Sequence, residues 1–165
     1  MGSIEDLCDA CEDGDEEQVK ALIESGEVDV NGLHDDSSPL MSAIVWNKPN
    51  IVKILLEFAN TDLNVVDSKG FNCLHWSCYH DREELVKVIV SDSRCNAEVL
   101  NLKSAGGDSP VMVCAWRASA GALSEIMKAE GCDLKTTDAK GMTLLEVARE
   151  KSDTEEVIKI LENIE

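Results

Sequence analysis

The stretch from Asp67 to Val90 decides the fold. It begins Asp67-Ser68-Lys69-Gly70-Phe71-Asn72-Cys73-Leu74-His75-Trp76-Ser77-Cys78 and ends Asp81-Arg82-Glu83-Glu84-Leu85-Val86-Lys87-Val88-Ile89-Val90. Gly70 suits a tight turn that needs a positive φ. Asn72 suits a helix N-cap, because apolar residues follow it at i, i+3 and i+4 spacing. The second half predicts a helix that is apolar over most of its circumference. A turn and two helices cannot bury that surface alone, so the pattern predicts neighbouring copies.

Such copies are present along the whole chain. The residues that match Asn72 are separated by 33, 34, 37 and 34 positions: Glu5, Ser38, Asn72, Ser109 and Thr143. A period near 33 residues is typical of a helical solenoid. One interval is longer because three extra residues lie within 91–100. We expect them to lengthen a loop after the second helix of the third repeat, without a role in function.

These motifs resemble the ankyrin repeat. Degraded forms of its T-P-L-H-x-A signature recur in register: Ser38-Pro39-Leu40-Met41-Ser42-Ala43, Asn72-Cys73-Leu74-His75-Trp76-Ser77, Ser109-Pro110-Val111-Met112-Val113-Cys114 and Thr143-Leu144-Leu145-Glu146-Val147-Ala148. The resemblance implies an all-α ankyrin-repeat solenoid of about five helix–turn–helix repeats, with polar repeats capping both ends. We place one domain over residues 1–165, with repeats at about 3–36, 37–69, 70–107, 108–140 and 141–165. By the same resemblance, His75 forms a hydrogen bond that ties neighbouring repeats together.

Composition points away from catalysis and export. The chain has 165 residues, of which 44% are hydrophobic and 29% charged, as expected of one globular domain. The three histidines show no catalytic spacing and there is no phosphate loop, so we predict neither an enzyme nor a cofactor. Seven cysteines without an export signal predict free thiols in the cytoplasm or nucleus. Cys8 and Cys11 fall on the inner face of a helix, so we expect no metal; a thiol sensor is a weaker alternative.

Charge is concentrated at the N-terminus. The net charge is −18, and residues 1–36 hold 13 acidic residues against the single base Lys20. Such a field repels nucleic acid and anionic membranes, so we predict no direct binding to either. No apolar run approaches the length of a membrane span. The acidic end would instead steer a basic protein partner.

The resemblance also implies a binding surface. Ankyrin repeats generally bind proteins on a concave surface made of the turn tips and the outward face of each first helix. Carried over to this sequence, the partner-binding candidates are Asp35, Val45, Trp46, Lys69, Phe71, Tyr79, His80, Asp108, Trp116, Arg117 and Met142. Four of the six aromatic residues fall on these positions, whereas Trp76 falls on a position that should face the core. The alternative is that Trp46 and Trp116 pack back onto neighbouring repeats.

The leading functional hypothesis is a monomeric scaffold or adaptor that binds a protein or peptide, basic in character, in an aromatic-lined groove. The alternative is a stand-alone inhibitor of a partner enzyme, such as a kinase, or of a cytoskeletal protein. The resemblance further implies that Asn64 is a candidate for β-hydroxylation, because Leu56 precedes it at the required distance.

Overall fold

The computed structural model describes residues 2–58 and 60–164. Met1, the first residue of the predicted domain, and Glu165, the last residue of the predicted fifth repeat, lie outside the described residues. Within the described part the chain is helical, with isolated β-bridges but no strand. The helices are α1 (Ile4–Asp13), α2 (Glu16–Glu24), α3 (Pro39–Val45), α4 (Pro49–Glu57), α5 (Cys73–Tyr79), α6 (Glu83–Val90), α7 (Ala97–Asn101), α8 (Pro110–Arg117), α9 (Ala120–Ile126), α10 (Leu144–Arg149) and α11 (Glu155–Glu162).

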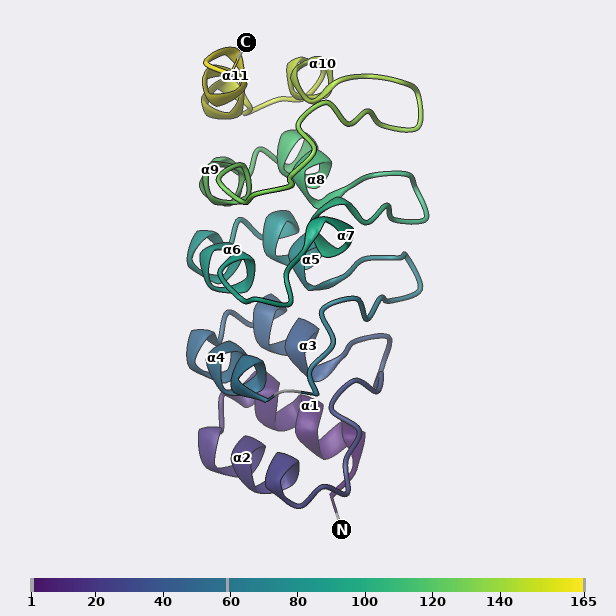
Figure 1. Ribbon diagram of the computed structural model, residues 1–165, viewed down its shortest axis with the longest axis vertical. Coiled ribbons are helices and arrows are strands. Elements are labelled where there is room, and N and C mark those ends of the chain that lie inside the picture. Colours follow the sequence, from purple (N-terminus) through teal and green to yellow (C-terminus); the bar gives the residue numbers. More distant parts are fainter. Residues whose placement is uncertain (1, 59, 165) are drawn as a thin grey trace.

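The helices stack in two columns (Figure 1). The first column runs α1, α3, α5, α8, α10, and the second runs α2, α4, α6, α9, α11. Hairpin-like loops project to one side of the first column, and the two chain ends lie at opposite ends of the stack. This arrangement confirms the predicted solenoid.

The helix starts follow from their capping residues. Ser38, Asn72, Ser109 and Thr143 are all N-cap residues, as the repeat register predicts. The first repeat differs, because its N-cap is Ser3, two residues ahead of the Glu5 position. There the Ser3 side chain accepts from the Asp6 N–H while the Asp6 carboxylate accepts from the Ser3 N–H. This reciprocal pair satisfies two otherwise unpaired groups, which fixes the earlier start.

The core lies between stacked helix pairs. Leu55 on α4, Leu74 on α5, Val86 on α6 and Leu123 on α9 are at most 1% exposed. Because each buried face is covered by a neighbouring pair, the stability of each pair depends on its neighbours.

His75 ties the third helix pair to the next hairpin, which confirms its predicted role. Its Nε2 lies 3.0 Å from the carbonyl oxygen of Asp108, and its Nδ1 accepts from the N–H of Asn72 at 3.2 Å. Burial lowers the pKa of His75 to about 4, so the ring is neutral at physiological pH. A neutral ring can donate from Nε2 and accept at Nδ1, which is the pattern these two contacts require.

The hairpins also touch one another directly. Gly70 has a φ of +75°, and the Ala105 N–H donates to the carbonyl of Lys69 at 2.8 Å. A Cβ added at Gly70 would lie 2.9 Å from the backbone nitrogen of Ala105. Gly141 occupies the matching place in the fifth repeat with a φ of +83°, yet a Cβ there would meet nothing within 4 Å. Gly70 is therefore required by both conformation and space, and Gly141 by conformation alone.

The segment after α6 differs from the expectation of a longer loop. It contains α7, whose Val99 and Leu100 are at most 1% exposed. The Asn72 side chain donates to the carbonyl of Val99 at 3.0 Å, which fixes α7 against the start of α5. The loop prediction is wrong because a count of extra residues does not reveal that Val99 and Leu100 join the core as part of a short helix.

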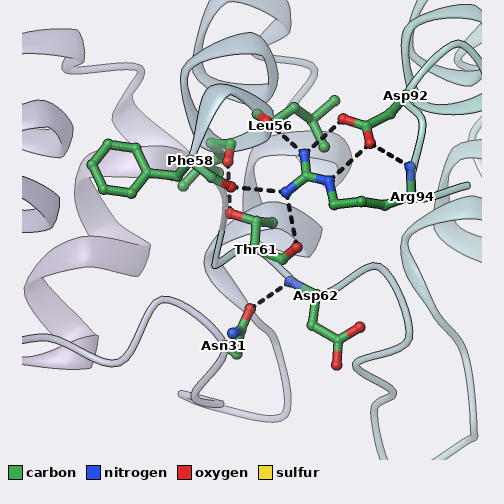
Figure 2. A network of polar contacts seen from close by, with 8 residues as sticks. Asn31, Leu56, Phe58, Thr61, Asp62, Asp92 and Arg94 are labelled. Atoms are coloured by element: carbon green, nitrogen blue, oxygen red, sulfur yellow. Dashed lines mark hydrogen bonds and ion pairs between the residues drawn. The ribbon is translucent and has the colours of Figure 1, made fainter.

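Arg94, just before α7, reaches back to the preceding repeat (Figure 2). Its guanidinium donates to the carbonyls of Leu56, Phe58 (2.8 Å) and Thr61 (3.1 Å), at and beyond the end of α4. Asp92 holds the guanidinium through a 2.6 Å contact, and the hydrogen bond from Arg94 lowers the pKa of the Asp92 carboxyl. The last carbonyls of a helix lack partners within it, so Arg94 caps α4 from the next repeat.

We expect Gly70→Ala to destabilise the fold more than Gly141→Ala. Gly141→Ala should cost about 1 kcal/mol, because alanine resists a left-handed conformation. Gly70→Ala should cost about 1–3 kcal/mol more, because its methyl group pushes against the next hairpin. Urea unfolding followed by circular dichroism measures both. Equal midpoints for the two variants would contradict the close approach of the hairpins.

We expect Arg94→Met to lower the stability by about 2 kcal/mol, because a charged donor to several carbonyls is lost. Arg94→Lys should recover only part of this, since lysine cannot supply the planar fork. The control is Lys128→Met, which removes an ion pair with Glu125 in which the lysine side chain is 67% exposed, and it should cost little. Thermal unfolding and amide exchange in the last turn of α4 report the effect. Arg94→Met and Lys128→Met of equal stability would show that the cap is unimportant.

Candidate protein-binding surface

In two of the hairpin tips, one aspartate side chain holds the turn. Ahead of α5, Asp67 Oδ1 accepts from the N–H groups of Lys69 and Phe71, both at 2.9 Å. Ahead of α10, Asp138 Oδ1 accepts from the N–H groups of Lys140 and Met142, both at 2.8 Å. These bonds fix the turn backbone without a partner strand. The tips therefore present their side chains beside the first-column helices at positions set by the fold.

The predicted binding residues differ in exposure. Exposed side chains are Asp35, Trp46, Lys69 and Arg117, and half-buried ones are Val45, Tyr79, His80, Asp108, Trp116 and Met142. Trp46 ends α3 and is 57% exposed, a large fraction for an indole. The candidate Asn64 is exposed too, which suits a modification site, and its hydroxylation stays a prediction.

Phe71 does not belong to the exposed set. It is only 8% exposed, because the hairpin closes through the Asp67 N–H donating to the Phe71 carbonyl at 3.1 Å. This closure lays the ring on α5, stacked on His75 with centroids 4.9 Å apart. The prediction of Phe71 as an exposed anchor is therefore wrong, and the ring supports the surface from beneath.

Trp76 is partly exposed, whereas Phe71 is buried. The sequence pattern predicts Trp76 in the core, yet its side chain is half-buried and its indole N–H donates to Asp67 Oδ2 at 3.0 Å. The matching positions hold the smaller Ser42, Val113 and Val147, all buried. The size of an indole at a position that otherwise takes small side chains is the signal that could have indicated its turn towards the hairpin.

An aromatic ladder crosses two repeats. Trp76 lies 5.4 Å from Tyr79, and Tyr79 lies 5.7 Å from Trp116, both edge to face between ring centroids. The Arg117 guanidinium lies 4.1 Å from the Tyr79 centroid. Trp116 is partly covered, and its buried indole N–H has no acceptor in the described part of the chain. The back-packing alternative thus describes Trp116 but not Trp46.

Charge next to the ladder is mixed. Burial, then the influence of Arg82 and Arg117, lowers the pKa of His80. Burial and the neighbouring Asp138 raise the pKa of Asp108. The lowered pKa disfavours the protonated form of His80, so Arg117 supplies the positive charge beside the ladder.

A hollow of about 300 Å³ lies where the second and third repeats meet. It is lined by both Trp46 and Trp76 and by carboxylates from the hairpin tips and α1. A second hollow of about 230 Å³ lies beside Trp116, in the matching place of the fourth and fifth repeats. An apolar hollow of about 520 Å³ lies at the last helix pair, lined mainly by leucines and containing none of the predicted binding residues.

The surroundings of Cys8 and Cys11 bear on the thiol-sensor alternative. The structure shows Cys8 and Cys11 as free thiols buried on the inner face of α1. Burial raises the pKa of Cys8 to about 11 and that of Cys11 further. Since the thiolate is the reactive form, the geometry gives no support to a thiol sensor. None of the helices in the described ranges is long and apolar enough to cross a bilayer.

Comparisons with known proteins agree with the architecture. Residues 7–101 match the family model described as ankyrin repeats in three copies. The chain is 27% identical over 127 residues to Rabankyrin-5 of Mus musculus and 28% identical over 128 residues to Rabankyrin-5 of Homo sapiens. Both alignments cover 77% of this chain but 10% of the relative, so the chain spans about a tenth of the length of these curated relatives. The chain belongs to the ankyrin-repeat family.

Proposed function

We propose that the chain is a non-enzymatic interaction module that binds a protein or peptide of basic character on its concave surface. Ankyrin repeats are generally protein–protein interaction modules, which supports the class of function. The binding residues are Trp46, Trp76, Tyr79 and Trp116, with Lys69 and Arg117 beside them. A scaffold or adaptor is the role that this surface suits best.

The observation that carries the proposal is the exposure of Trp46. An indole that is 57% exposed leaves a large apolar area in water, and tryptophan is among the residues that dominate interface energetics. It lies beside a hollow that also contains Trp76, so an incoming side chain would cover both rings. The net charge of −18 favours a basic partner and speeds its approach.

The proposal includes an intracellular location in the cytoplasm or nucleus and a monomeric chain. Seven free thiols support a reducing compartment. Inhibition of a partner enzyme or of a cytoskeletal protein would use the same surface, and the identity of the partner separates that role from an adaptor.

Affinity capture with matched variants tests this proposal. Trp46→Ala should weaken binding of the captured partner at least about tenfold, the effect of removing an interface anchor of about 2 kcal/mol. The fold should remain intact because Trp46 is exposed. The control is Ile164→Ala, which removes a side chain that is 43% exposed just after α11 and lies outside the predicted binding residues. Quantitative mass spectrometry and then titration with the purified partner give the comparison.

Charge variants at the acidic end test whether the first repeat steers the partner. Asp15 is unsuitable because its side chain caps α2, accepting from the Gln18 N–H at 3.0 Å. Glu17 and Glu24 are exposed, so Glu17→Gln and Glu24→Gln should alter mainly the association rate and its salt dependence. Normal binding by Trp46→Ala together with failure of the glutamine variants would place recognition at the first repeat and contradict the proposal.

A further inference from the structure

The hollow between the second and third repeats combines two indoles with unequal charge. Its lining contains four carboxylates, Glu12, Asp35, Asp36 and Asp67, against the single cation Lys69. Carboxylates alone would not define a ligand, because acidic side chains are common on this chain. The two indole rings that line the same hollow limit the ligand to a group that can also contact aromatic rings.

The carboxylates are not equally engaged within the chain. Asp67 already accepts hydrogen bonds from the N–H groups of its turn and from the Trp76 indole N–H. Asp36 accepts from the N–H (2.8 Å) and the hydroxyl (2.5 Å) of Ser68. Glu12 has one long contact, 3.5 Å from the Ser42 hydroxyl. The Asp35 side chain is 94% exposed, and its Oδ2 lies 3.7 Å from Nε2 of His34, beyond hydrogen-bond distance. Glu12 and Asp35 therefore keep acceptor capacity for an incoming donor.

The rings already attract a cation. Lys69 Nζ lies 5.3 Å from the centroid of the Trp76 ring, within the range of a cation–π contact. Trp46, on the same hollow, shows no such contact within the described residues. A cation that entered beside Trp46 would meet an uncovered ring and the two carboxylates with spare acceptors.

We propose that this hollow holds an arginine side chain of the partner, stacked on Trp46 and hydrogen-bonded to Glu12 and Asp35. This assignment rests on the proposed function and specifies what that surface recognises. Arginine fits better than lysine because a planar guanidinium stacks on an indole and presents several donors to carboxylates at once. Charge complementarity favours a cationic side chain over any neutral or acidic one.

The hollow beside Trp116 provides an internal comparison. It stands in the same register two repeats away, but its lining balances three carboxylates with Lys140 and Lys151. The Trp116 ring is partly covered by Tyr79, whereas Trp46 is open. An arginine side chain should therefore prefer the hollow at Trp46.

The test is a titration of the intact chain with the peptide acetyl-Gly-Arg-Gly-amide, followed by NMR. The three tryptophans give three indole N–H signals, assigned through Trp→Phe variants. We expect saturable shifts of the Trp46 and Trp76 signals and none of the Trp116 signal. The same peptide with citrulline, a neutral isostere of arginine, should produce no saturable shift.

Two variants test the charges separately. Glu12→Gln with Asp35→Asn should weaken the peptide at least about tenfold, because both charged acceptors are lost. Asparagine keeps the turn, since Asp35 has a φ of +47° and asparagine tolerates that conformation. Lys69→Met should strengthen binding about threefold or more by removing the competing cation.

Equal binding of the citrulline peptide, shifts confined to Trp116, no saturable shift, or weaker binding by Lys69→Met would each overturn the assignment. The peptide experiment needs no partner. Its failure would therefore leave Trp46-dependent capture standing, while loss of that dependence would refute the proposed function itself.

Discussion

Each helix pair in this chain is held by its neighbours, and contacts between adjacent repeats determine the rest of the structure. The apolar faces meet between pairs, and polar ties reinforce the same junctions. Arg94 caps the end of α4 from the following repeat, and His75 bonds to the carbonyl of Asp108 in the next hairpin. The Asn31 side chain likewise accepts from the Asp62 N–H at 2.8 Å (Figure 2). Each of these bonds joins backbone of one repeat to a side chain of its neighbour.

These contacts between repeats restrict the motion of the hairpins beside the proposed binding surface. A hairpin that is bonded to the next hairpin, as at Lys69 and Ala105, cannot tilt freely. The residues at its tip therefore keep their spacing relative to α3 and α5. A surface that is ordered before binding loses less entropy on association, so a few exposed side chains can give useful affinity. Trp76 is held in this way, because its indole N–H donates to Asp67 in that hairpin.

The sequence predicted the repeat register and most of the helix starts, because each capping residue acts locally on the turn that follows it. Ser38, Asn72 and Thr143 needed no knowledge of the neighbouring repeats. The sequence did not predict side-chain placements that depend on the space between neighbouring groups. Phe71 is buried and Trp76 is partly exposed, the reverse of the prediction. An indole is too large for the position of Trp76, and the closed hairpin packs the phenyl ring of Phe71 against α5. The role of Arg94 was also missed, since its partners are backbone carbonyls that leave no mark in the sequence.

Hydrogen–deuterium exchange of the chain, alone and with its captured partner, tests the central claim that the concave surface of the second to fourth repeats binds protein. We expect protection in segments 35–46, 67–80 and 108–117, with little change in the second-column helices α4 and α6. Protection confined to α4 and α6, or to the acidic residues before position 30, would contradict that claim.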